Sequence, residues 1–103
     1  MTIGVIADGR PWVVPVHIAT RNGFDFEWYS HTDTVHSQAI EQDPTIAISL
    51  YRSRQGDDLE LGIYIQATAE KLLENPDGTA RYRAVADEVW LNDHTHVKRR
   101  LTF

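Results

Sequence analysis

Short runs of alternating apolar and polar residues, separated by turn residues, make up most of this 103-residue chain. The clearest run is Phe24–Ser30, in which aromatic residues occupy one face and mostly polar residues the other. A period of two residues is typical of a strand with one buried face. Asp8-Gly9 and Arg21-Asn22-Gly23 are hairpin-turn signals on either side of the apolar run that precedes it. We therefore expect antiparallel strands joined by short turns.

The whole pattern predicts six strands and two short helices. The strands are expected at residues 2–7, 11–20, 24–30, 45–51, 59–72 and 95–103, and the helices at 34–42 and 79–91. The run at 11–20 is apolar at almost every position, so we expect it to be covered on both sides. Pro15 within it indicates an edge position, a bulge, or a backbone carbonyl side that faces a ligand, because proline has no N–H to donate. Regularly spaced antiparallel strands favour a β-barrel, so we expect a single domain, residues 1–103, that is mainly β.

Capping residues mark the ends of the first helix. Asp33 or Thr34 is expected to cap its start. Asp43-Pro44 is expected to end it, because the residue before a proline avoids the helical conformation. Its apolar face is expected to consist of Val35, Ala39 and Ile40. The second helix is expected to follow a turn at residues 75–78 and to bury its larger apolar side chains, Tyr82, Val85, Val89 and Trp90.

Composition and charge narrow the class of function. The net charge of −5 argues against a nucleic-acid or anionic-membrane partner. No segment approaches the roughly 20 apolar residues of a membrane span, and residues 1–4 lack a signal-peptide pattern, so we expect a cytoplasmic protein. The absence of cysteine excludes disulfides and thiolate chemistry. The three cations Lys98-Arg99-Arg100, on the last expected strand, would form a solvated face or attract an anion locally.

Hydroxyl and imidazole side chains gather where the first helix is expected to begin. Helix N-termini bind anions through their backbone N–H groups, so one hypothesis is that Ser30, Thr34 and His36 contact a phosphate. The same residues would also serve as ordinary helix caps beside a surface histidine. The residues themselves leave both interpretations open. No arrangement of acid, base and nucleophile is recognisable, so no catalytic residue is assigned.

A metal site is a third, weaker hypothesis for the histidines. His31, Asp33 and His36 could supply ligands, and His94 and His96 would share one face of an extended strand. No spacing in the chain matches a zinc motif such as His-Glu-x-x-His. We therefore assign no metal.

With these elements placed, residues 2–71 resemble the pyridoxamine 5′-phosphate oxidase-like proteins, which are flavin-binding split barrels. The resemblance rests on the order and spacing of "DGRP", "VVPVHIA", "FDFEWYS" and a helix that ends in "EQDPTIAISLY". It implies a six-stranded antiparallel split barrel that forms a homodimer and binds flavin mononucleotide (FMN) at the subunit interface. It also implies an oxidoreductase of flavin-reductase or nitroreductase type, which acts on an unidentified small substrate.

The resemblance also implies which residues contact the cofactor. They come from the second strand, the end of the aromatic strand and the start of the helix: Val13, Val14, Pro15, Val16, His17, Tyr29, Ser30, Thr34, Val35 and His36. Family members usually carry arginine and lysine where this chain has Val35 and His36. Histidine is mostly neutral near pH 7, so we expect weaker phosphate binding that improves on acidification.

An alternative function follows from the missing basic residues. The chain would then be a non-catalytic, dimeric split-barrel binding protein with a degenerate flavin site, or with a haem site as in some similar split barrels. The chain has few residues before its first expected strand, so we do not expect a pyridoxamine phosphate oxidase itself. The tryptophans Trp12, Trp28 and Trp90 are expected in the core or in a dimer interface.

Overall fold

The computed structural model describes residues 1–52, 61–93 and 98–102. Within these residues there are eight strands and one helix: β1 (Thr2–Ala7), β2 (Arg10–Pro15), β3 (Thr20–Asn22), β4 (Asp25–His31), α1 (Val35–Gln42), β5 (Thr45–Arg52), β6 (Leu61–Glu74), β7 (Thr79–Asn92) and β8 (Lys98–Leu101). All paired strands are antiparallel. The predicted mainly-β, antiparallel fold is confirmed, with more strands and fewer helices than expected. No helix in the described ranges is long and apolar enough to cross a membrane.

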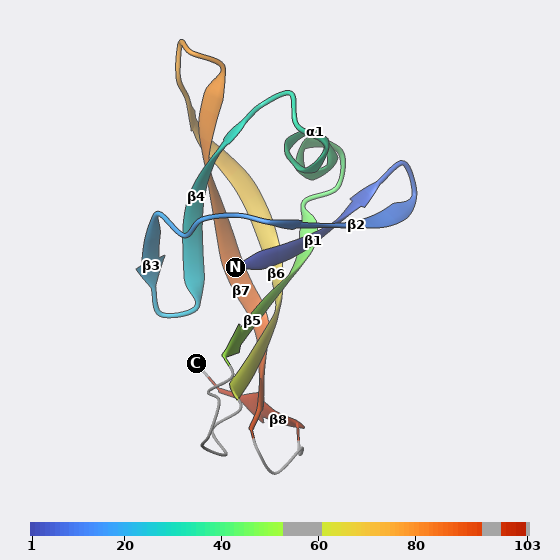
Figure 1. Ribbon diagram of the computed structural model, residues 1–103, viewed down its shortest axis with the longest axis vertical. Helices are drawn as coiled ribbons and strands as arrows, with labels where there is room; N and C mark the ends of the chain where they lie inside the picture. Colours follow the sequence, from blue (N-terminus) through green and yellow to red (C-terminus); the bar gives the residue numbers. More distant parts are fainter. Residues whose placement is uncertain (53–60, 94–97, 103) are drawn as a thin grey trace.

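The strands form one sheet in the order β2-β1-β5-β6-β7-β4-β3, and β8 pairs with β7. The β6–β7 hairpin, with 14 residues in each strand, is its centre. One edge of β7 carries two partners, because β4 pairs with its first residues and β8 with its last. Figure 1 shows the strongly twisted sheet, with α1 and β8 towards opposite ends of the molecule. The molecule is elongated, with extents of 45 × 25 × 24 Å.

The core lies on the inner face of the curled sheet. Its largest fully buried side chains are Trp28, Tyr82 and Phe26, and isoleucines of β1, β5 and β6 pack around them. Trp28 and Tyr82 are partners in the β4–β7 ladder, and their rings stack with centroids 5.8 Å apart. The indole Nε1 of Trp28 and the hydroxyl of Tyr82 are both buried, and neither has a hydrogen-bond partner among the described residues.

The helix predicted at residues 79–91 is wrong, because this segment is strand β7. Ala80, Tyr82 and Ala84 are buried at alternate positions, which is the period of a strand. Alanine contributes little to a hydrophobic pattern, so the larger apolar residues dominated the prediction, and their spacing resembles that of a helix. A bulge in the β6–β7 ladder then changes the phase, so that Val89 is also buried.

The prediction that the segment 11–20 is a strand covered on both sides is also wrong. β2 ends at Pro15 and is the exposed edge of the sheet, with Val13 66% exposed. The edge position indicated by Pro15 is confirmed. Just past β2, Val16 donates its N–H to the carbonyl of Met1 at 2.8 Å. Because N–H groups alternate along a strand, positions 11, 13 and 15 face the free edge, and two of these three are prolines.

Candidate functional site

Helix α1 begins directly after β4 and a short turn, and its first turn is held by Thr34. The Thr34 hydroxyl accepts a hydrogen bond from the N–H of Ser37 at 3.2 Å, which confirms Thr34 as the N-cap. Asp43 ends the helix, as predicted. The predicted buried face is only partly correct: Ala39 and Ile40 are buried, but Val35 is 47% exposed. The helix is rotated so that polar residues of its first turn are buried instead.

Those buried polar residues form a compact cluster with the end of β4, which we call the α1 cluster: Ser30, Thr34, His36 and Ser37. The Nε2 atom of His36 lies 2.9 Å from the Ser30 hydroxyl and 3.4 Å from the Thr34 hydroxyl. The Thr34 and Ser37 hydroxyls are 2.7 Å apart, and Ser37 is completely buried. The structure thus brings together three of the residues predicted to contact phosphate, and they are hydrogen-bonded to one another.

His36 is not a surface residue. It is 8% exposed, and burial lowers the pKa of its imidazole below the ordinary value, because the charged ring would lose its hydration. The neutral ring is therefore the dominant form at pH 7. The α1 cluster has the position and the hydroxyl groups of an anion site, but it carries no permanent positive charge.

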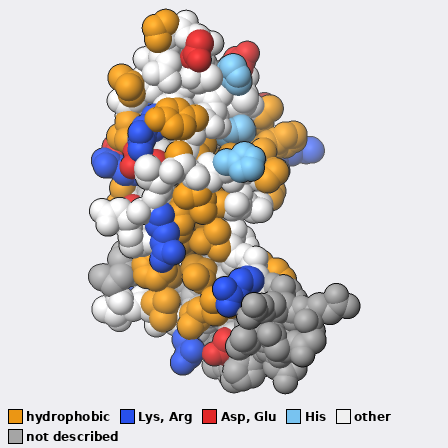
Figure 2. All heavy atoms as spheres, turned by 60° about the vertical axis from the view of Figure 1, so that its left-hand side comes forward, with side chains coloured by type: hydrophobic (Ala, Val, Ile, Leu, Met, Phe, Trp, Pro, Cys, Tyr) orange, Lys and Arg blue, Asp and Glu red, His pale blue; other side chains and the backbone are white. Residues whose placement is uncertain are grey.

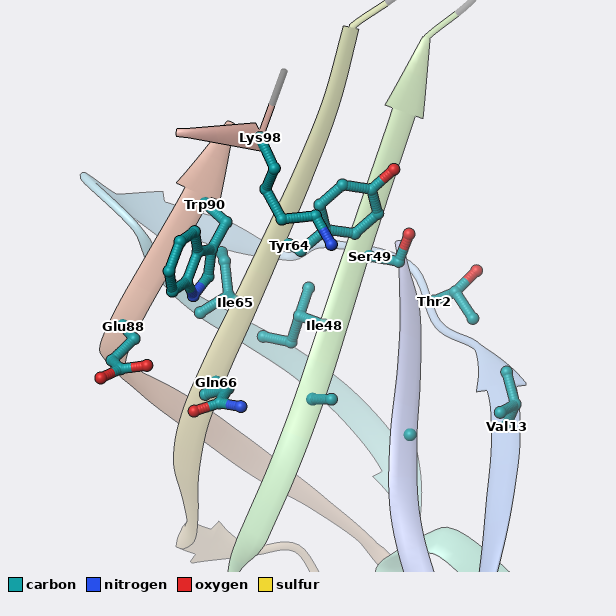
Figure 3. Close-up of a pocket in the computed structure, with 12 residues that line it drawn as sticks. Thr2, Val13, Ile48, Ser49, Tyr64, Ile65, Gln66, Glu88, Trp90 and Lys98 are labelled. Carbon is teal, nitrogen blue, oxygen red and sulfur yellow. The ribbon is translucent and has the colours of Figure 1, made fainter. Parts of the chain in front are cut away.

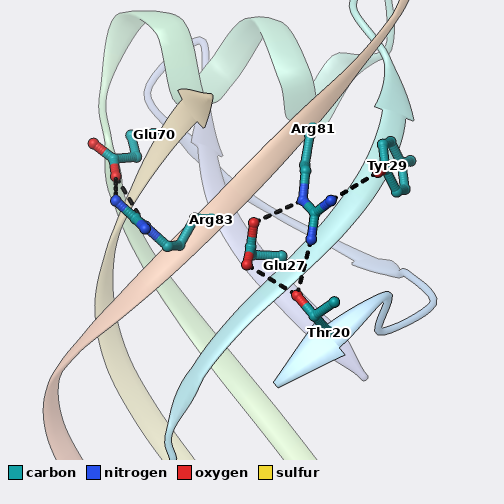
Figure 4. A network of polar contacts seen from close by, with 6 residues as sticks. All are labelled: Thr20, Glu27, Tyr29, Glu70, Arg81 and Arg83. Carbon is teal, nitrogen blue, oxygen red and sulfur yellow. Dashed lines mark hydrogen bonds and ion pairs between the residues drawn. The ribbon is translucent and has the colours of Figure 1, made fainter. Parts of the chain in front are cut away.

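The other predicted residues lie elsewhere. Tyr29 points to the outer face of the sheet, where its hydroxyl accepts a hydrogen bond from Nη1 of Arg81 at 2.9 Å (Figure 4). Val13 and Val14 are on the edge strand β2, which Pro15 ends, and Val16 and His17 belong to the segment that follows it. Val13 is an outer-face residue and does not join the α1 cluster.

Sequence reasoning missed the polar network around Arg81. The Nε of Arg81 donates to the Glu27 carboxylate at 2.7 Å, and its Nη2 donates to the Thr20 hydroxyl at 3.2 Å. This hydrogen-bonded ion pair lowers the pKa of Glu27 and raises that of Arg81. A second pair joins Arg83 to Glu70, with Nε 3.0 Å from the carboxylate (Figure 4). The network joins β3, β4 and β7. The only sequence signal for it is the presence of opposite charges at alternate positions of two strands that are far apart in the chain.

A cavity of about 530 Å³ lies on the outer face of the sheet and is called here the outer-face cavity. Strands β1, β2, β5, β6, β7 and β8 all contribute to it: Thr2, Gly4, Val13, Ala47, Ile48, Ser49, Tyr64, Ile65, Gln66, Glu88, Trp90 and Lys98. Figure 3 shows Trp90 and Tyr64 on neighbouring strands, with Lys98 reaching over the Tyr64 ring. Sequence reasoning did not find this cavity, because no short segment contains more than a few of its residues.

The metal hypothesis gains no support from the described part of the chain. Among residues 1–52, 61–93 and 98–102, no three histidine, aspartate or glutamate side chains gather as a metal site. The Nε2 of His36 faces the Ser30 hydroxyl. His94 and His96 lie outside the described residues.

No family model matches the chain, and no curated protein matches its sequence. Solved structures do match. A general stress protein 26-related protein of the pyridoxinephosphate oxidase family from Clostridium acetobutylicum is 14% identical with a TM-score of 0.76, over 99% of this chain and 84% of that one. An FAD-binding protein from Mesorhizobium loti is 14% identical with a TM-score of 0.72, over 85% of this chain and 78% of that one. A haem-binding protein from Mycobacterium smegmatis is 12% identical with a TM-score of 0.81, over 98% of this chain and 51% of that one.

These similarities define the class of fold. The chain is a mainly-β split barrel. Its structural neighbours include pyridoxamine 5′-phosphate oxidase-like proteins, so the resemblance found in the sequence is confirmed at the level of the fold. The chain spans about half the length of the haem-binding protein.

Proposed function

We propose that this chain is a small FMN-binding split-barrel protein, with the cofactor phosphate at the start of α1. The observation that carries the proposal is the α1 cluster: a capped helix N-terminus directly follows the aromatic strand β4, within a fold shared with flavin-binding proteins. Ser30, Thr34 and His36 would hold the phosphate. A bound flavin supplies redox chemistry of its own, which would make the protein an oxidoreductase of flavin-reductase or nitroreductase type.

The residues fit a phosphate in hydrogen-bonding capacity but not in charge. Hydroxyls and the N–H groups of a helix N-terminus are suitable donors. Arginine or lysine would add a permanent charge, whereas His36 is neutral until a nearby anion raises its pKa. To bind a phosphate, the Ser30–His36 hydrogen bond would have to open. We therefore expect weak binding.

The internal hydrogen bonding of the α1 cluster favours a second candidate function. Ser30 is paired with His36, and Thr34 with Ser37, so these side chains already have hydrogen-bond partners within the cluster. In that case the protein is a non-catalytic split-barrel binding protein with a degenerate flavin site. The ligand of such a binding protein could also be haem, because a haem-binding protein shares the fold.

Binding of FMN and riboflavin distinguishes the two candidates, because riboflavin lacks the phosphate. If the phosphate sits at the α1 cluster, FMN binds more tightly, and its advantage grows on acidification between about pH 8.5 and 5.5. The phosphate raises the pKa of His36 in the complex, so the gain is complete below the free pKa and is lost above the bound one. The second ionisation of the phosphate, near pH 6, opposes part of this trend.

The decisive variant is His36→Ala, with His31→Ala as the matched control on an exposed histidine. His36→Ala should abolish the pH-dependent preference for FMN, and His31→Ala should keep it. Equal binding of both flavins at every pH would remove the FMN proposal and leave the α1 cluster as a structural cap. If FMN binds, reduction of the bound flavin by a nicotinamide donor, followed by absorbance, tests the oxidoreductase assignment.

We also propose that the protein is a homodimer. Apolar side chains remain exposed on single molecules, among them Val13, Trp12 and Ile18. Figure 2 shows apolar side chains along the middle of one face, with histidine side chains gathered above and lysine and arginine side chains beside them. The prolines at the free edge of β2 disfavour strand-to-strand pairing, so two copies would pack by their faces. Sedimentation showing only monomer at micromolar concentration would contradict this proposal.

A further inference from the structure

The β3–β4 hairpin carries an asparagine–glycine pair at its turn. Asn22 is the last residue of β3, and Gly23 begins the turn that leads to β4. Both residues are exposed. Apart from its chain neighbours, no described atom lies within 4 Å of the position that a Cβ atom on Gly23 would occupy. The surroundings of Gly23 are therefore open, and it has no side chain that would hinder a reaction at its backbone nitrogen.

Strand β3 is held weakly enough to open by itself. It has three residues, all of them exposed, and it is an edge of the sheet that pairs with β4. A segment with so few buried contacts opens at a small free-energy cost, without unfolding of the rest of the domain. The Asn22 side-chain amide forms no hydrogen bond with another described residue. Arg21 contacts the turn through the carbonyl of Gly23, at 2.7 Å, and not through its nitrogen.

The other two asparagines of the chain lie in better protected places. Asn75 precedes Pro76, whose nitrogen has no proton to lose, and its Nδ2 donates to the Thr79 hydroxyl at 3.1 Å. Asn92 is paired with β6 on one side and with β8 on the other. The aspartate–glycine pair Asp77-Gly78 has a similar backbone, but a carboxylate is a poorer electrophile than an amide. Asn22 thus combines the reactive group with an accessible position.

We propose that Asn22 is a site of spontaneous deamidation, with water as the co-reactant. The backbone nitrogen of Gly23 attacks Cγ of Asn22, so a new C–N bond forms and the bond from Cγ to the side-chain nitrogen breaks. That nitrogen leaves as ammonia and takes the proton of the Gly23 N–H, which leaves a cyclic succinimide. Water then adds to one of the two ring carbonyls and opens the ring to aspartate or isoaspartate. Nothing is oxidised or reduced.

The new carboxylate destabilises the pairing of β3 with β4. Asn22 is directly opposite Asp25 in the ladder, and side chains so placed have their Cβ atoms about 5 Å apart. Like charges in this position repel each other. Asp25 does not turn away without a cost, because its Oδ1 accepts the N–H of Ala86 at 3.0 Å. Isoaspartate also lengthens the backbone by one methylene group, which disturbs the register that the turn sets. Deamidation therefore releases β3 from the sheet.

Release of β3 dissolves part of the polar network around Arg81. The Thr20 hydroxyl donates to the Glu27 carboxylate at 2.9 Å and accepts from Nη2 of Arg81 at 3.2 Å (Figure 4). Ala19, just before β3, donates its N–H to the carbonyl of Glu27 at 2.7 Å. These contacts depend on the pairing of β3 with β4. None of these residues belongs to the α1 cluster, so the inference is independent of the proposed FMN phosphate site.

Mass spectrometry of the aged protein tests the chemistry. The native protein is incubated at mildly alkaline pH and then digested under acidic conditions, which suppress further deamidation. The peptide that contains Asn22 should gain the mass difference between an amide and a carboxyl group, and should separate into aspartate and isoaspartate forms. Peptides with Asn75 and Asn92 are internal controls and should stay unmodified. The variant Asn22→Gln should also stay unmodified, because its longer side chain forms a cyclic imide much more slowly.

Hydrogen exchange tests the structural consequence. The N–H of Ala19 should exchange about two- to fivefold faster in Asn22→Asp than in Asn22→Gln, the factor that corresponds to like charges placed opposite each other in a sheet. The aged native protein, which also contains isoaspartate, should show a larger increase. The N–H of Ala69, which donates to the carbonyl of Pro44 at 2.8 Å, is the control and should exchange at the same rate in all samples.

Two results would overturn the proposal. The first is an unmodified Asn22 in the protein after an incubation that deamidates a synthetic peptide of residues 19–25, because the hairpin would then protect the amide. The second is equal exchange of the Ala19 N–H in Asn22→Asp, Asn22→Gln and the aged protein, because β3 would then stay paired in spite of the new carboxylate.

Discussion

Replacement of Thr34 by alanine tests the reasoning about the α1 cluster most directly. The Thr34 hydroxyl accepts from the Ser37 N–H and lies 2.7 Å from the completely buried Ser37 hydroxyl. Loss of an N-cap costs about 1 kcal/mol. The Ser37 hydroxyl, left buried without its partner, adds about 1–2 kcal/mol. We therefore expect Thr34→Ala to lower the free energy of unfolding by about 2–3 kcal/mol, a large part of the stability of a small domain.

A double-mutant cycle separates the two contributions. Ser37→Ala removes the hydroxyl that would be orphaned, so the double variant Thr34→Ala/Ser37→Ala should lose only about 1–2 kcal/mol. The sum of the losses in the two single variants should then exceed the loss in the double variant by about 1 kcal/mol. Thr34→Ser keeps the hydroxyl and is the control, with stability close to native.

Urea unfolding gives the free energies, and thermal unfolding provides a second measure. For a domain of this size, 1 kcal/mol corresponds to about 5 °C in the midpoint, so Thr34→Ala should melt about 10–15 °C lower. Additive single effects, or a loss below about 0.5 kcal/mol for Thr34→Ala, would refute the idea that Thr34 holds the first turn of α1.

Three further predictions concern His36, Tyr82 and Pro15. Burial lowers the pKa of His36 in the folded state, so the stabilisation from His36 is complete above the unfolded-state pKa near 6.5 and is lost as the pH falls through the folded-state pKa. The urea midpoints of the native protein and of His36→Gln should therefore converge on acidification, and a constant difference between them would contradict this. Tyr82→Phe removes a buried hydroxyl that has no partner among the described residues, so the free energy of unfolding should stay unchanged or rise by up to about 1 kcal/mol. A clear fall in the free energy of unfolding would show that the hydroxyl is hydrogen-bonded in solution. Pro15→Val adds an N–H to the free edge of β2, so light scattering should detect faster association on warming, whereas unchanged association would mean that the proline does not protect the edge.

Local signals predicted the parts of the fold that local chemistry decides. The alternation in β4, the cap at Thr34 and the stop at Asp43 each depend on a few neighbouring residues, and each is confirmed. Strand β7 was missed because three of its buried positions are alanines, which bury little apolar area and so leave a weak pattern. The edge strand β2 was misjudged because an exposed apolar strand and a doubly covered one have the same sequence pattern.

The candidate sites were predicted less well, because they depend on contacts between distant residues. The burial of His36 follows from the rotation of α1 against the sheet, which the helix sequence alone does not specify. The pairing of Glu27 with Arg81 requires the register of β4 against β7. The outer-face cavity requires the order of six strands. Of the residues predicted to contact the cofactor, Ser30, Thr34 and His36 lie together, whereas Tyr29 and Val13 lie on other surfaces.

The long β6–β7 hairpin suggests an order of folding. Residues 75–78 alone connect its two strands, so closing this loop costs little conformational entropy. By contrast, pairing β4 with β7 joins positions as far apart in the sequence as Phe26 and Ala84. We expect the hairpin to form in the folding transition state and β4 to join afterwards. Asp77 accepts hydrogen bonds from both the N–H and the hydroxyl of Thr79 in the connecting turn, so Asp77→Ala should slow folding, whereas a substitution in β4 should mainly speed unfolding, as stopped-flow kinetics would show.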